Sequence, residues 1–491
     1  MWRQLPYLAK LEKAGIPTVI VDFEDQANMV KEESLGSGVP HIRSLHASRT
    51  LPGPEDVDNW LNDALNALVE PLTEEEQESG FHNPQQPRIL FEGTLEEAEE
   101  FYMQERWVPH PVNAPISVYT DGWPIVVPTE ERVAEMLKGT SHRPDEVLTY
   151  QSDRFKYRYS GEQRDSGSGD KGQPVRFQPR LFTATVEQVA VNAVMAGCKP
   201  EHLPVVLAIA ESTCPIGSTH TFGQFLCVSG PITKEIGMSS GCGMYGPGNR
   251  ANACIGRAYE LIARNLGGAI TGVNRMTSIG SPFEGCRCGA ENADALPPSW
   301  KGLNEEAGFK KDENVIMVLG HVNDGIRGVQ FSPGGYRALQ KSGHGGIARR
   351  LGVKGIPGPH NWLEYLIPEF WACREGPKTI IMVPEMARHL YEIGFKSKEE
   401  VYEWLWKKSF MTVKQYRDFS WPDFSTNGWL GIEPTSGKHW KELPDDYMVP
   451  AAGHDPSGFC IIVGGGDEEV SQQLSGRWSF QNTMISIDAW R

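Results

Sequence analysis

Hydrophobic and polar positions in the first 72 residues follow a regular succession of short apolar runs and amphipathic stretches. The run IPTVIVDFED at 16–25 is rich in β-branched residues and ends in acids, which predicts a buried strand. Residues 26–35 indicate a helix, 41–48 (HIRSLHAS) a second strand, and 56–69 an amphipathic helix. This strand–helix–strand–helix order predicts a small α/β layer with a parallel sheet.

The next stretch, residues 73–180, alternates between polar segments and short elements. Residues 73–86 are acidic and polar and predict a linker, and RILFEG at 88–93 predicts a strand. Thr94 begins a capping-box pattern before an acidic helix, and Thr129 precedes the helical sequence EERVAEML. The sequence SGEQRDSGSGDKGQ at 160–173 is typical of a flexible loop or linker.

The central block begins near residue 181 and carries the clearest helical periodicity. Thr185 and Gln188 form a capping-box pattern before an apolar stripe that predicts a helix ending at Gly197. The apolar runs PVVLAIAES, FGQFLCVSG and ENVIMVLGH each predict a strand.

The last block, from residue 376, repeats the plan of strand, turn and helix. PKTIIMVP predicts a strand, Ser397 opens the helix EEVYEWLWKK, and GFCIIV predicts a strand that runs into three glycines. We therefore expect an α/β fold with small parallel-sheet units at both ends and a larger central α/β domain. The expected organisation is an N-terminal unit (1–72), a connecting segment (73–180), the central domain with its glycine-rich loop (181–375), and a C-terminal unit (376–491) that packs with the first.

Composition and charge indicate which kinds of molecule the chain is expected to bind. The chain has 47 Lys and Arg against 63 Asp and Glu, a net charge of −16, and no basic stripe, so we expect no nucleic-acid partner. A small anionic substrate needs only one or two local arginines. No apolar run is long enough for a membrane span and no signal peptide is recognisable, so a cytoplasmic protein is expected. The 35 Pro and 52 Gly imply long ordered loops, which favour a homo-oligomer or a partner subunit.

The strongest candidate site is a glycine-rich loop that runs into a helix, SSGCGMYGPGNRANACIGRA at 239–258. Glycines allow close backbone approach, and a helix start offers unpaired N–H donors to an anion. No Gly-Lys-Ser/Thr follows, and GCGMYG follows no clear strand, so an organic nucleotide cofactor is not expected. A turn needed only for packing is the alternative. The expected substrate-binding residues are Gly246, Gly248, Asn249, Arg250, Asn252 and, from a later loop, Asn292.

A second candidate is His220, at the end of the loop CPIGSTH between two predicted strands. Histidine is the usual general acid or base near neutral pH, and site residues of α/β folds gather at strand ends. A hydrogen-bonded structural histidine is the alternative.

The third candidate is GCRCGAEN at 285–292, which contains Cys286, Cys288 and Glu291. Thiols in a glycine-flanked loop could be nucleophilic, redox-active or metal-binding, although C-x-C is a poor redox spacing. A zinc site would need two further ligands, which Cys214, His220 or Cys242 could supply. A pair of unreactive cysteines is the alternative.

Two weaker patterns follow predicted strands. Asp22, Glu24 and Asp25 end the first strand, where they could bind a ribose hydroxyl or a metal, or form a solvated acidic turn. The glycines 464–466 follow the strand FCIIV and could cradle an anion.

A family resemblance is carried by VEQVAVNAVMAGCKPEHLPVVLAIAE, by GPGNRANACIGRA, and by CGAEN with the later NEEAGF. These segments resemble the large domain of bacterial proteins related to the UGSC-motif (seleno)proteins. GIPTVIVDFED and IIVGGGDEE resemble the smaller domain, and together they span roughly two thirds of the chain. The resemblance implies thiol or redox chemistry. No Cys-Gly-Ser-Cys occurs and the first cysteine is Cys198, so that motif's role does not carry over to the N-terminal unit.

The sequence therefore predicts an enzyme that acts on a small carboxylate-bearing anion by acid/base or thiol-assisted addition–elimination, as lyases and hydratases do. Arg250 and Asn249 would hold the anion, His220 would move a proton, and Cys288 with Glu291 would supply a nucleophile or second acid/base. One alternative is a thiol- or metal-dependent oxidoreductase with a transition metal on Cys286, Cys288, Cys242 or His220. Another is a non-catalytic subunit or binding protein of a redox complex.

Overall fold

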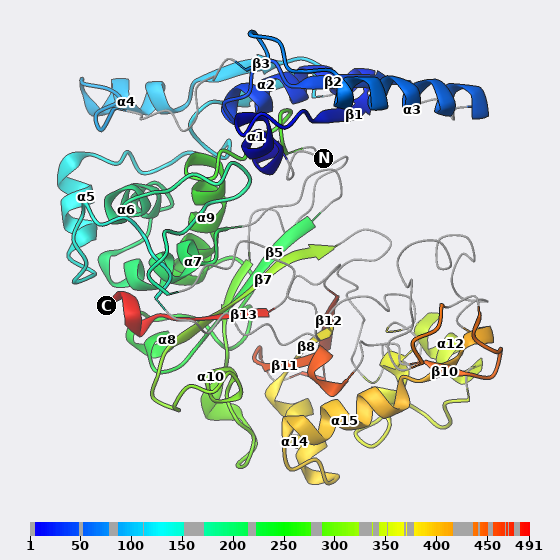
Figure 1. Ribbon diagram of the computed structural model, residues 1–491. Helices are drawn as coiled ribbons and strands as arrows, with labels where there is room; N and C mark the ends of the chain where they lie inside the picture. The colour runs from blue at the N-terminus through cyan, green and yellow to red at the C-terminus, as the bar shows by residue number, and fades with distance from the viewer. Residues whose placement is uncertain are drawn as a thin grey trace. The chain divides into compact units, whose positions relative to one another are not determined.

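The computed structural model of the chain is a mixed α/β protein, as the sequence predicts (Figure 1). It describes residues 5–48, 53–77, 87–110, 112–151, 171–214, 222–275, 287–323, 336, 343–350, 352–367, 370, 378–415, 436–439, 442–449, 455–466, 468–469, 471–475 and 482–491.

The chain divides into two compact units, and each draws on stretches that are distant in the sequence. Unit 1 comprises Met1–Tyr150, Gly172–His220 and Ala258–Ser278. Unit 2 comprises Gln151–Lys171, Thr221–Arg257 and Ile279–Arg491. The four consecutive segments expected from the sequence stay a prediction.

The N-terminal layer of unit 1 is the predicted strand–helix–strand–helix unit, and its two strands pair in parallel with Val19 opposite Arg43. Figure 1 shows the helices α1, α2 and α3 beside β1 and β2. Leu5, Ala9, Ile20, Val30 and Val39 form its buried core. The elements are α1 (Leu5–Lys13), β1 (Val19–Phe23), η2 (Glu24–Gln26), α2 (Ala27–Gly36), β2 (Arg43–Ala47) and α3 (Pro54–Val69).

The remainder of unit 1 is mainly helical. Thr94, Thr129 and Thr185 each cap a helix by accepting a hydrogen bond from the backbone N–H three residues later, as the sequence predicts for Thr94 and Thr185. The elements are α4 (Leu95–Tyr102), β3 (Glu105–Val108), β4 (Ala114–Ser117), α5 (Glu130–Leu137), α6 (Val186–Met195), η3 (Pro200–His202) and α7 (Leu203–Glu211).

Two of the strand predictions in this region are wrong. PVVLAIAES lies in helix α7, where every residue from Leu203 to Glu211 is buried, so no polar face reveals the helical period. Pro204 occupies the first turn, where its missing N–H costs no hydrogen bond. Residues 88–93 form no strand, and the ring of Phe91 stacks on that of Phe101 with the ring centroids 5.2 Å apart.

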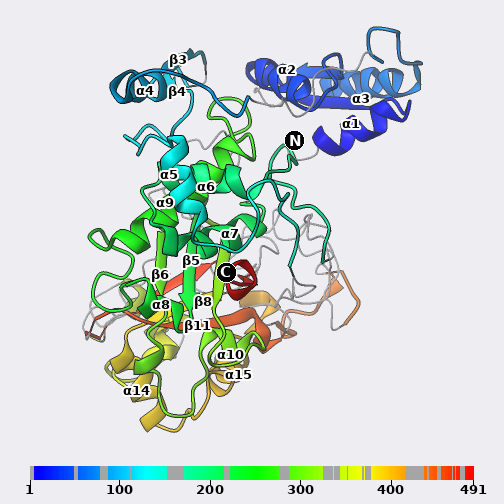
Figure 2. The same ribbon diagram turned by 90° about the vertical axis from the view of Figure 1, so that its left-hand side faces the viewer.

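A four-stranded mixed sheet of order β13-β7-β5-β6 lies in unit 2. β5 pairs in parallel with β6 and antiparallel with β7 (Figure 2). The predicted strands 222–230 and 313–321 are confirmed, and the glycine-rich loop leads into a helix as expected. The elements are β5 (Phe222–Ser229), α8 (Ile232–Glu235), α9 (Arg250–Asn265, of which 258–265 belong to unit 1), β6 (Arg287–Ala290), η4 (Ala293–Ala295), α10 (Leu303–Glu306), β7 (Val315–Asn323), α12 (Gly343–Arg350), η5 (Trp362–Leu366), β13 (Asn482–Ser486) and η8 (Asp488–Trp490).

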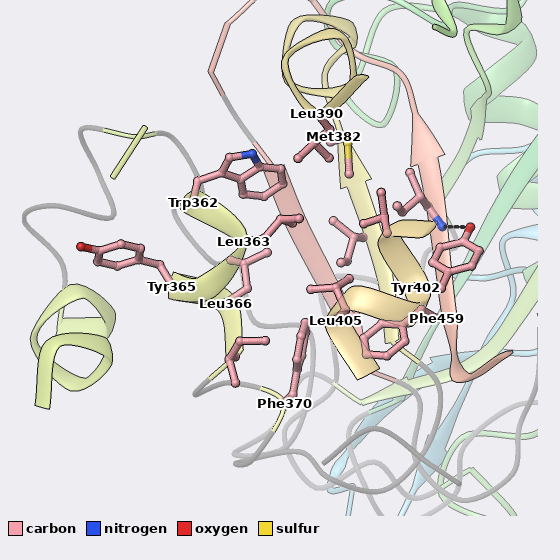
Figure 3. Close-up of a cluster of buried hydrophobic side chains, with 14 of the residues drawn as sticks. Trp362, Leu363, Tyr365, Leu366, Phe370, Met382, Leu390, Tyr402, Leu405 and Phe459 are labelled. Carbon is pink, nitrogen blue, oxygen red and sulfur yellow. Dashed lines mark hydrogen bonds between the residues drawn. The ribbon is translucent and has the colours of Figure 1, made fainter. Parts of the chain in front are cut away.

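A second sheet of unit 2 has the order β11-β8-β12, with β8 and β11 parallel. Figure 3 shows the apolar cluster over it, in which Phe459 of β11 lies near Phe370 and Leu405, and the two phenyl rings meet edge to face at 5.3 Å. The predicted helix opened by Ser397 is confirmed. The elements are β8 (Lys378–Met382), α14 (Pro384–Glu392), α15 (Lys398–Lys408), β9 (Met411–Thr412), β10 (Met448–Val449), η7 (Pro456–Gly458), β11 (Phe459–Val463) and β12 (Ser471–Ser475).

Across the described ranges, no helix combines the length and the apolar character that crossing a membrane requires.

Candidate functional site

The carboxyl ends of three strands of unit 2 meet at one place. β8 and β11 end together, with Met382 opposite Val463. The backbone N–H of Asn292, just past β6, donates to the Val463 carbonyl oxygen at 2.8 Å. Gly464 donates its N–H to the Met382 carbonyl oxygen at 3.0 Å. Ligands of α/β proteins commonly bind beyond the carboxyl ends of strands, so this edge is where a site is expected.

A cavity of about 570 Å³ lies at this edge, within unit 2. That volume suits a small organic molecule. Its walls come from the start of α14, from the loops after β6 and β11, and from the glycine-rich loop. The lining residues are Gly241, Asn292, Asp294, Ala295, Leu296, Pro384, Arg388, Gly465 and Gly466.

Close packing explains why glycines form one wall. A Cβ on Gly466 would lie 3.0 Å from the Cβ of Cys242, and a Cβ on Gly464 would lie 2.6 Å from the Met244 sulfur. Gly465 has φ +98°, which side chains rarely adopt. Its N–H donates to the Ser240 carbonyl oxygen at 2.9 Å, so the two glycine loops suggested by the sequence lie side by side.

Two polar side chains of this cavity have no hydrogen-bond partner among the residues the structure describes. They are the amide of Asn292, which is half-buried, and the guanidinium of Arg388, which is exposed. Asp294 also lines the cavity, but its carboxylate pairs with the Lys234 ammonium at 2.5 Å. The helix α14 begins at Pro384 on this wall, and a helix start favours negative charge.

The predicted anion-binding residues of the glycine-rich loop have other partners. The Asn249 amide oxygen accepts the Asn252 N–H at 3.0 Å, and its amide nitrogen donates to the Gly237 carbonyl oxygen at 2.8 Å. Asn252 is buried and donates to the carbonyl oxygens of Ser239 and Met244, both at 2.8 Å. These amides hold the loop against the start of α9, and neither lines the cavity.

The remaining predicted residues of this loop are Gly246, Gly248 and Arg250. Gly246 donates its N–H to the Gly243 carbonyl oxygen at 2.7 Å, and Gly248 takes the positive φ of +118° that the turn before the helix requires. Arg250 is the first residue of α9 and is exposed. Of the predicted substrate-binding residues, the cavity therefore contains Asn292.

The predicted nucleophile Cys288 lies inside the sheet on β6 and is 3% exposed. Burial raises the pKa of its thiol well above the ordinary value, so the thiol is protonated at neutral pH. Neither its position nor its protonation suits a nucleophile, and its catalytic role stays a prediction. Cys242, next to Gly466, is exposed and forms no disulfide.

Glu291, the other predicted catalytic group, is the centre of a buried ionic network. One carboxylate oxygen accepts from the Lys398 ammonium at 3.1 Å. The other accepts from the Ser229 hydroxyl at 2.7 Å and from the Leu303 N–H at 2.8 Å. The side chains of Glu291 and Lys398 are both 0% exposed. This carboxylate is enclosed by donors, so the geometry favours a structural role for it.

The same ammonium serves a second carboxylate. Lys398 donates to Glu306 at 2.9 Å and to the Ile461 carbonyl oxygen at 3.1 Å. The Tyr402 hydroxyl donates to Glu306 at 2.8 Å and accepts the Ile461 N–H at 2.9 Å, a contact drawn as the dashed line at Tyr402 in Figure 3. Burial alone lowers the pKa of Lys398, but the charges of Glu291 and Glu306 outweigh it and raise that pKa.

Two sequence-predicted residues, His220 and Cys286, lie outside the described residues. In the part of the chain that is described, no group of three or more His, Cys, Asp or Glu side chains could hold a metal ion.

Three residues of this region were not predicted to matter: Arg388, Lys398 and Tyr402. Lys398 and Tyr402 lie in a helix that the sequence does predict, but their partners are distant in the sequence. Lys398 is 107 residues from Glu291, and Tyr402 is 96 residues from Glu306. Arg388 lies four residues after Pro384. The sequence signal for its helix was a proline at the helix start followed by an amphipathic stretch.

No family model, curated protein or solved structure matches the chain. The resemblance to the UGSC-motif group therefore stays a prediction.

Proposed function

We propose that unit 2 is the binding part of an enzyme that acts on a small anionic molecule held in the cavity. The observation that carries this proposal is a pair of polar groups on the walls of one cavity, the Arg388 guanidinium and the Asn292 amide, which have no hydrogen-bond partner in the described part of the chain. A guanidinium presents a planar fork of donors that fits a carboxylate or phosphate. In this proposal, Arg388 and Asn292 bind the anion in place of Arg250 and Asn249, which the sequence predicted for that role.

The reactive group in the proposal is the exposed thiol of Cys242, whose neighbour Gly241 lines the cavity. In thiol-assisted addition–elimination, the sulfur bonds to an electrophilic carbon of the substrate as the π bond at that carbon breaks, and the thiol proton moves to the atom at the other end of that π bond. Elimination then re-forms a π bond in the substrate as the carbon–sulfur bond breaks, and a proton returns to the sulfur. The thiol is regenerated, so no net redox reagent is consumed. Cys288 is unsuitable for this role because it is buried and protonated.

Calorimetric titration with inorganic phosphate, succinate and citrate tests the binding step. Replacing Arg388 with Gln removes one charge-assisted hydrogen bond, worth about 1.5–3 kcal/mol, so affinity for the best anion should fall by about 10-fold or more. Asn292→Ala should weaken it by roughly 3- to 10-fold. The matched control is Lys407→Gln, which removes an exposed charge that pairs with the exposed Glu403.

Equal anion affinity in wild type, Arg388→Gln and Lys407→Gln would contradict the proposal. A second measurement follows the thiol. The bound anion should slow alkylation of Cys242 by iodoacetamide in wild type, and should lose this effect in Arg388→Gln. An unchanged alkylation rate at saturating anion would separate Cys242 from the binding site and remove it as the reactive group.

A further inference from the structure

The two parallel strands of unit 1 bring a serine, a histidine and an aspartate together. Asp22 of β1 lies directly opposite His46 of β2 in the register of the sheet. Ser44 stands two residues before His46, and alternate residues of a strand share one face. All three side chains therefore lie on the same side of the sheet.

The aspartate is the inner member of this group. Its side chain is 0% exposed, whereas that of His46 is 36% exposed. The carboxylate does not form the solvated acidic turn that the sequence suggests as one reading of Asp22. A buried carboxylate needs a donor, and His46 supplies one: its Nδ1 lies 2.5 Å from the Asp22 Oδ1.

This contact fixes the chemistry of the imidazole. An ionised carboxylate only accepts hydrogen bonds, so Nδ1 must carry the hydrogen of the neutral ring. The lone pair of the neutral ring is then on Nε2, which lies 3.4 Å from the Ser44 hydroxyl oxygen. A nucleophile near a base, with the base oriented by a third group, is the signature of an activated serine, and the first contact is often long before substrate binds.

We propose that Asp22, His46 and Ser44 form a second active site, which hydrolyses small neutral carboxylic esters. Ser44 and His46 are the catalytic residues, and Asp22 positions His46. This inference does not depend on the anion cavity of unit 2.

The reaction balances with water as the only co-reactant. The Ser44 oxygen forms a bond to the ester carbonyl carbon while His46 Nε2 takes the hydroxyl proton. The carbon–oxygen bond to the leaving alcohol breaks, and the alcohol takes that proton from His46. Water then attacks the acyl-serine through the same base, releasing the carboxylic acid and restoring Ser44.

Labelling of the full chain with a fluorophosphonate probe, followed by peptide mapping, tests the nucleophile. The expected result is one adduct on Ser44, abolished in Ser44→Ala and unchanged in Ser48→Ala. Ser48 is the matched control because it is an exposed serine just past the end of the same strand. An unlabelled Ser44 in folded wild type would overturn the proposal.

Hydrolysis of p-nitrophenyl acetate tests the base. His46→Gln should lower kcat/KM by about 100-fold or more, because general-base catalysis contributes that much. Equal rates in wild type, Ser44→Ala and His46→Gln would overturn the proposal. Asp22→Asn should lower kcat with KM unchanged, since the amide no longer selects the Nδ1–H tautomer. If that variant fails to fold, the Ser44→Ala and His46→Gln variants still decide the outcome.

Discussion

At the scale of single residues, the main feature of unit 2 is one ammonium between two buried carboxylates. Lys398 holds Glu291 and Glu306, and each carboxylate also accepts a hydroxyl hydrogen bond, from Ser229 and Tyr402 respectively. A buried ionic group stabilises a fold only while its partners are complete. Since Asn292 follows Glu291 directly, this network also anchors the wall of the cavity.

Replacing Lys398 with Met should lower the free energy of unfolding by about 3–5 kcal/mol, because it leaves two buried carboxylates without their cation. Urea unfolding followed by intrinsic fluorescence measures this. The matched control is Lys407→Met on the same helix, whose ammonium is exposed and should contribute about 0–1 kcal/mol. Losses of equal size in the two variants would show that the network is not the anchor inferred from its geometry.

Cysteine reactivity should divide sharply between two positions. Cys242 is exposed, whereas Cys288 is buried and burial raises the pKa of its thiol. Native protein treated with iodoacetamide should therefore carry the label on Cys242 and not on Cys288, which should react only after denaturation. Mass spectrometry of the digested protein measures both sites at once. Rapid native labelling of Cys288 would contradict the buried placement.

The sequence identified some individual residues of the site and missed the rest for a physical reason. Asn292 stood out because it follows two cysteines and an acid in a glycine-flanked loop. The role of Glu291 as an ion-pair partner was out of reach, because Lys398 lies 107 residues further along the chain. Local patterns give the type of a side chain and its element, but not the distant group that it meets.

At the scale of elements, caps and periodicity were reliable wherever one face of the element is polar. The capping box at Thr185 and the cap at Ser397 begin helices where expected. Periodicity did not reveal α7, because a fully buried helix has no polar face and its apolar run resembles a buried strand. It also missed β6, whose four residues include a glycine and an arginine.

Glycine positions give a prediction at this scale. A Cβ on Gly289 of β6 would lie 2.6 Å from the ring of Tyr245, so Gly289→Ala should destabilise the protein by about 1–3 kcal/mol through overpacking. Gly346 in α12 has open space around it, so Gly346→Ala should stabilise that helix by roughly 1 kcal/mol. Denaturant unfolding compares the two. A Gly289→Ala protein as stable as wild type would contradict the close packing of Tyr245 on β6.

At the scale of the whole molecule, the α/β class follows from the sequence, but the division into two units does not. Both units combine stretches separated by more than a hundred residues, and the boundary between Arg257 and Ala258 falls within helix α9. A pattern read along the chain cannot show which distant elements share a core. The grouping depends on long-range contacts such as that of Glu33 with Asn274, 241 residues apart.

The buried carboxyl group of Glu33 predicts that the free energy of unfolding depends on pH. Burial raises the pKa of Glu33 above its ordinary 4.5, and the charge of Arg180 and the Asn274 hydrogen bond offset this only in part. The folded state therefore holds this proton more tightly than the unfolded chain. The resulting stability is fully present below pH 4.5 and is lost as the pH rises through the raised value.

Glu33→Gln removes this titration. Between pH 4 and pH 7, wild type should lose stability relative to Glu33→Gln, by about 1.4 kcal/mol for each unit of the pKa difference. Melting temperatures of the two proteins across this range measure the change. Only the slope is diagnostic, because loss of the Arg180 partner adds a constant offset. A difference that is independent of pH, or that runs in the opposite direction, would contradict the raised pKa.

The central claim is that the cavity of unit 2 holds a small anion between Arg388 and Asn292. Crystals of the full chain soaked in sodium selenate, with data collected at the selenium absorption edge, test it most directly. The claim predicts an anomalous peak within hydrogen-bond distance of the Arg388 guanidinium and the Asn292 amide, and no such peak in crystals of Arg388→Gln. Selenate found only at other surfaces of the wild-type protein, with this cavity unoccupied at saturating concentration, would contradict it.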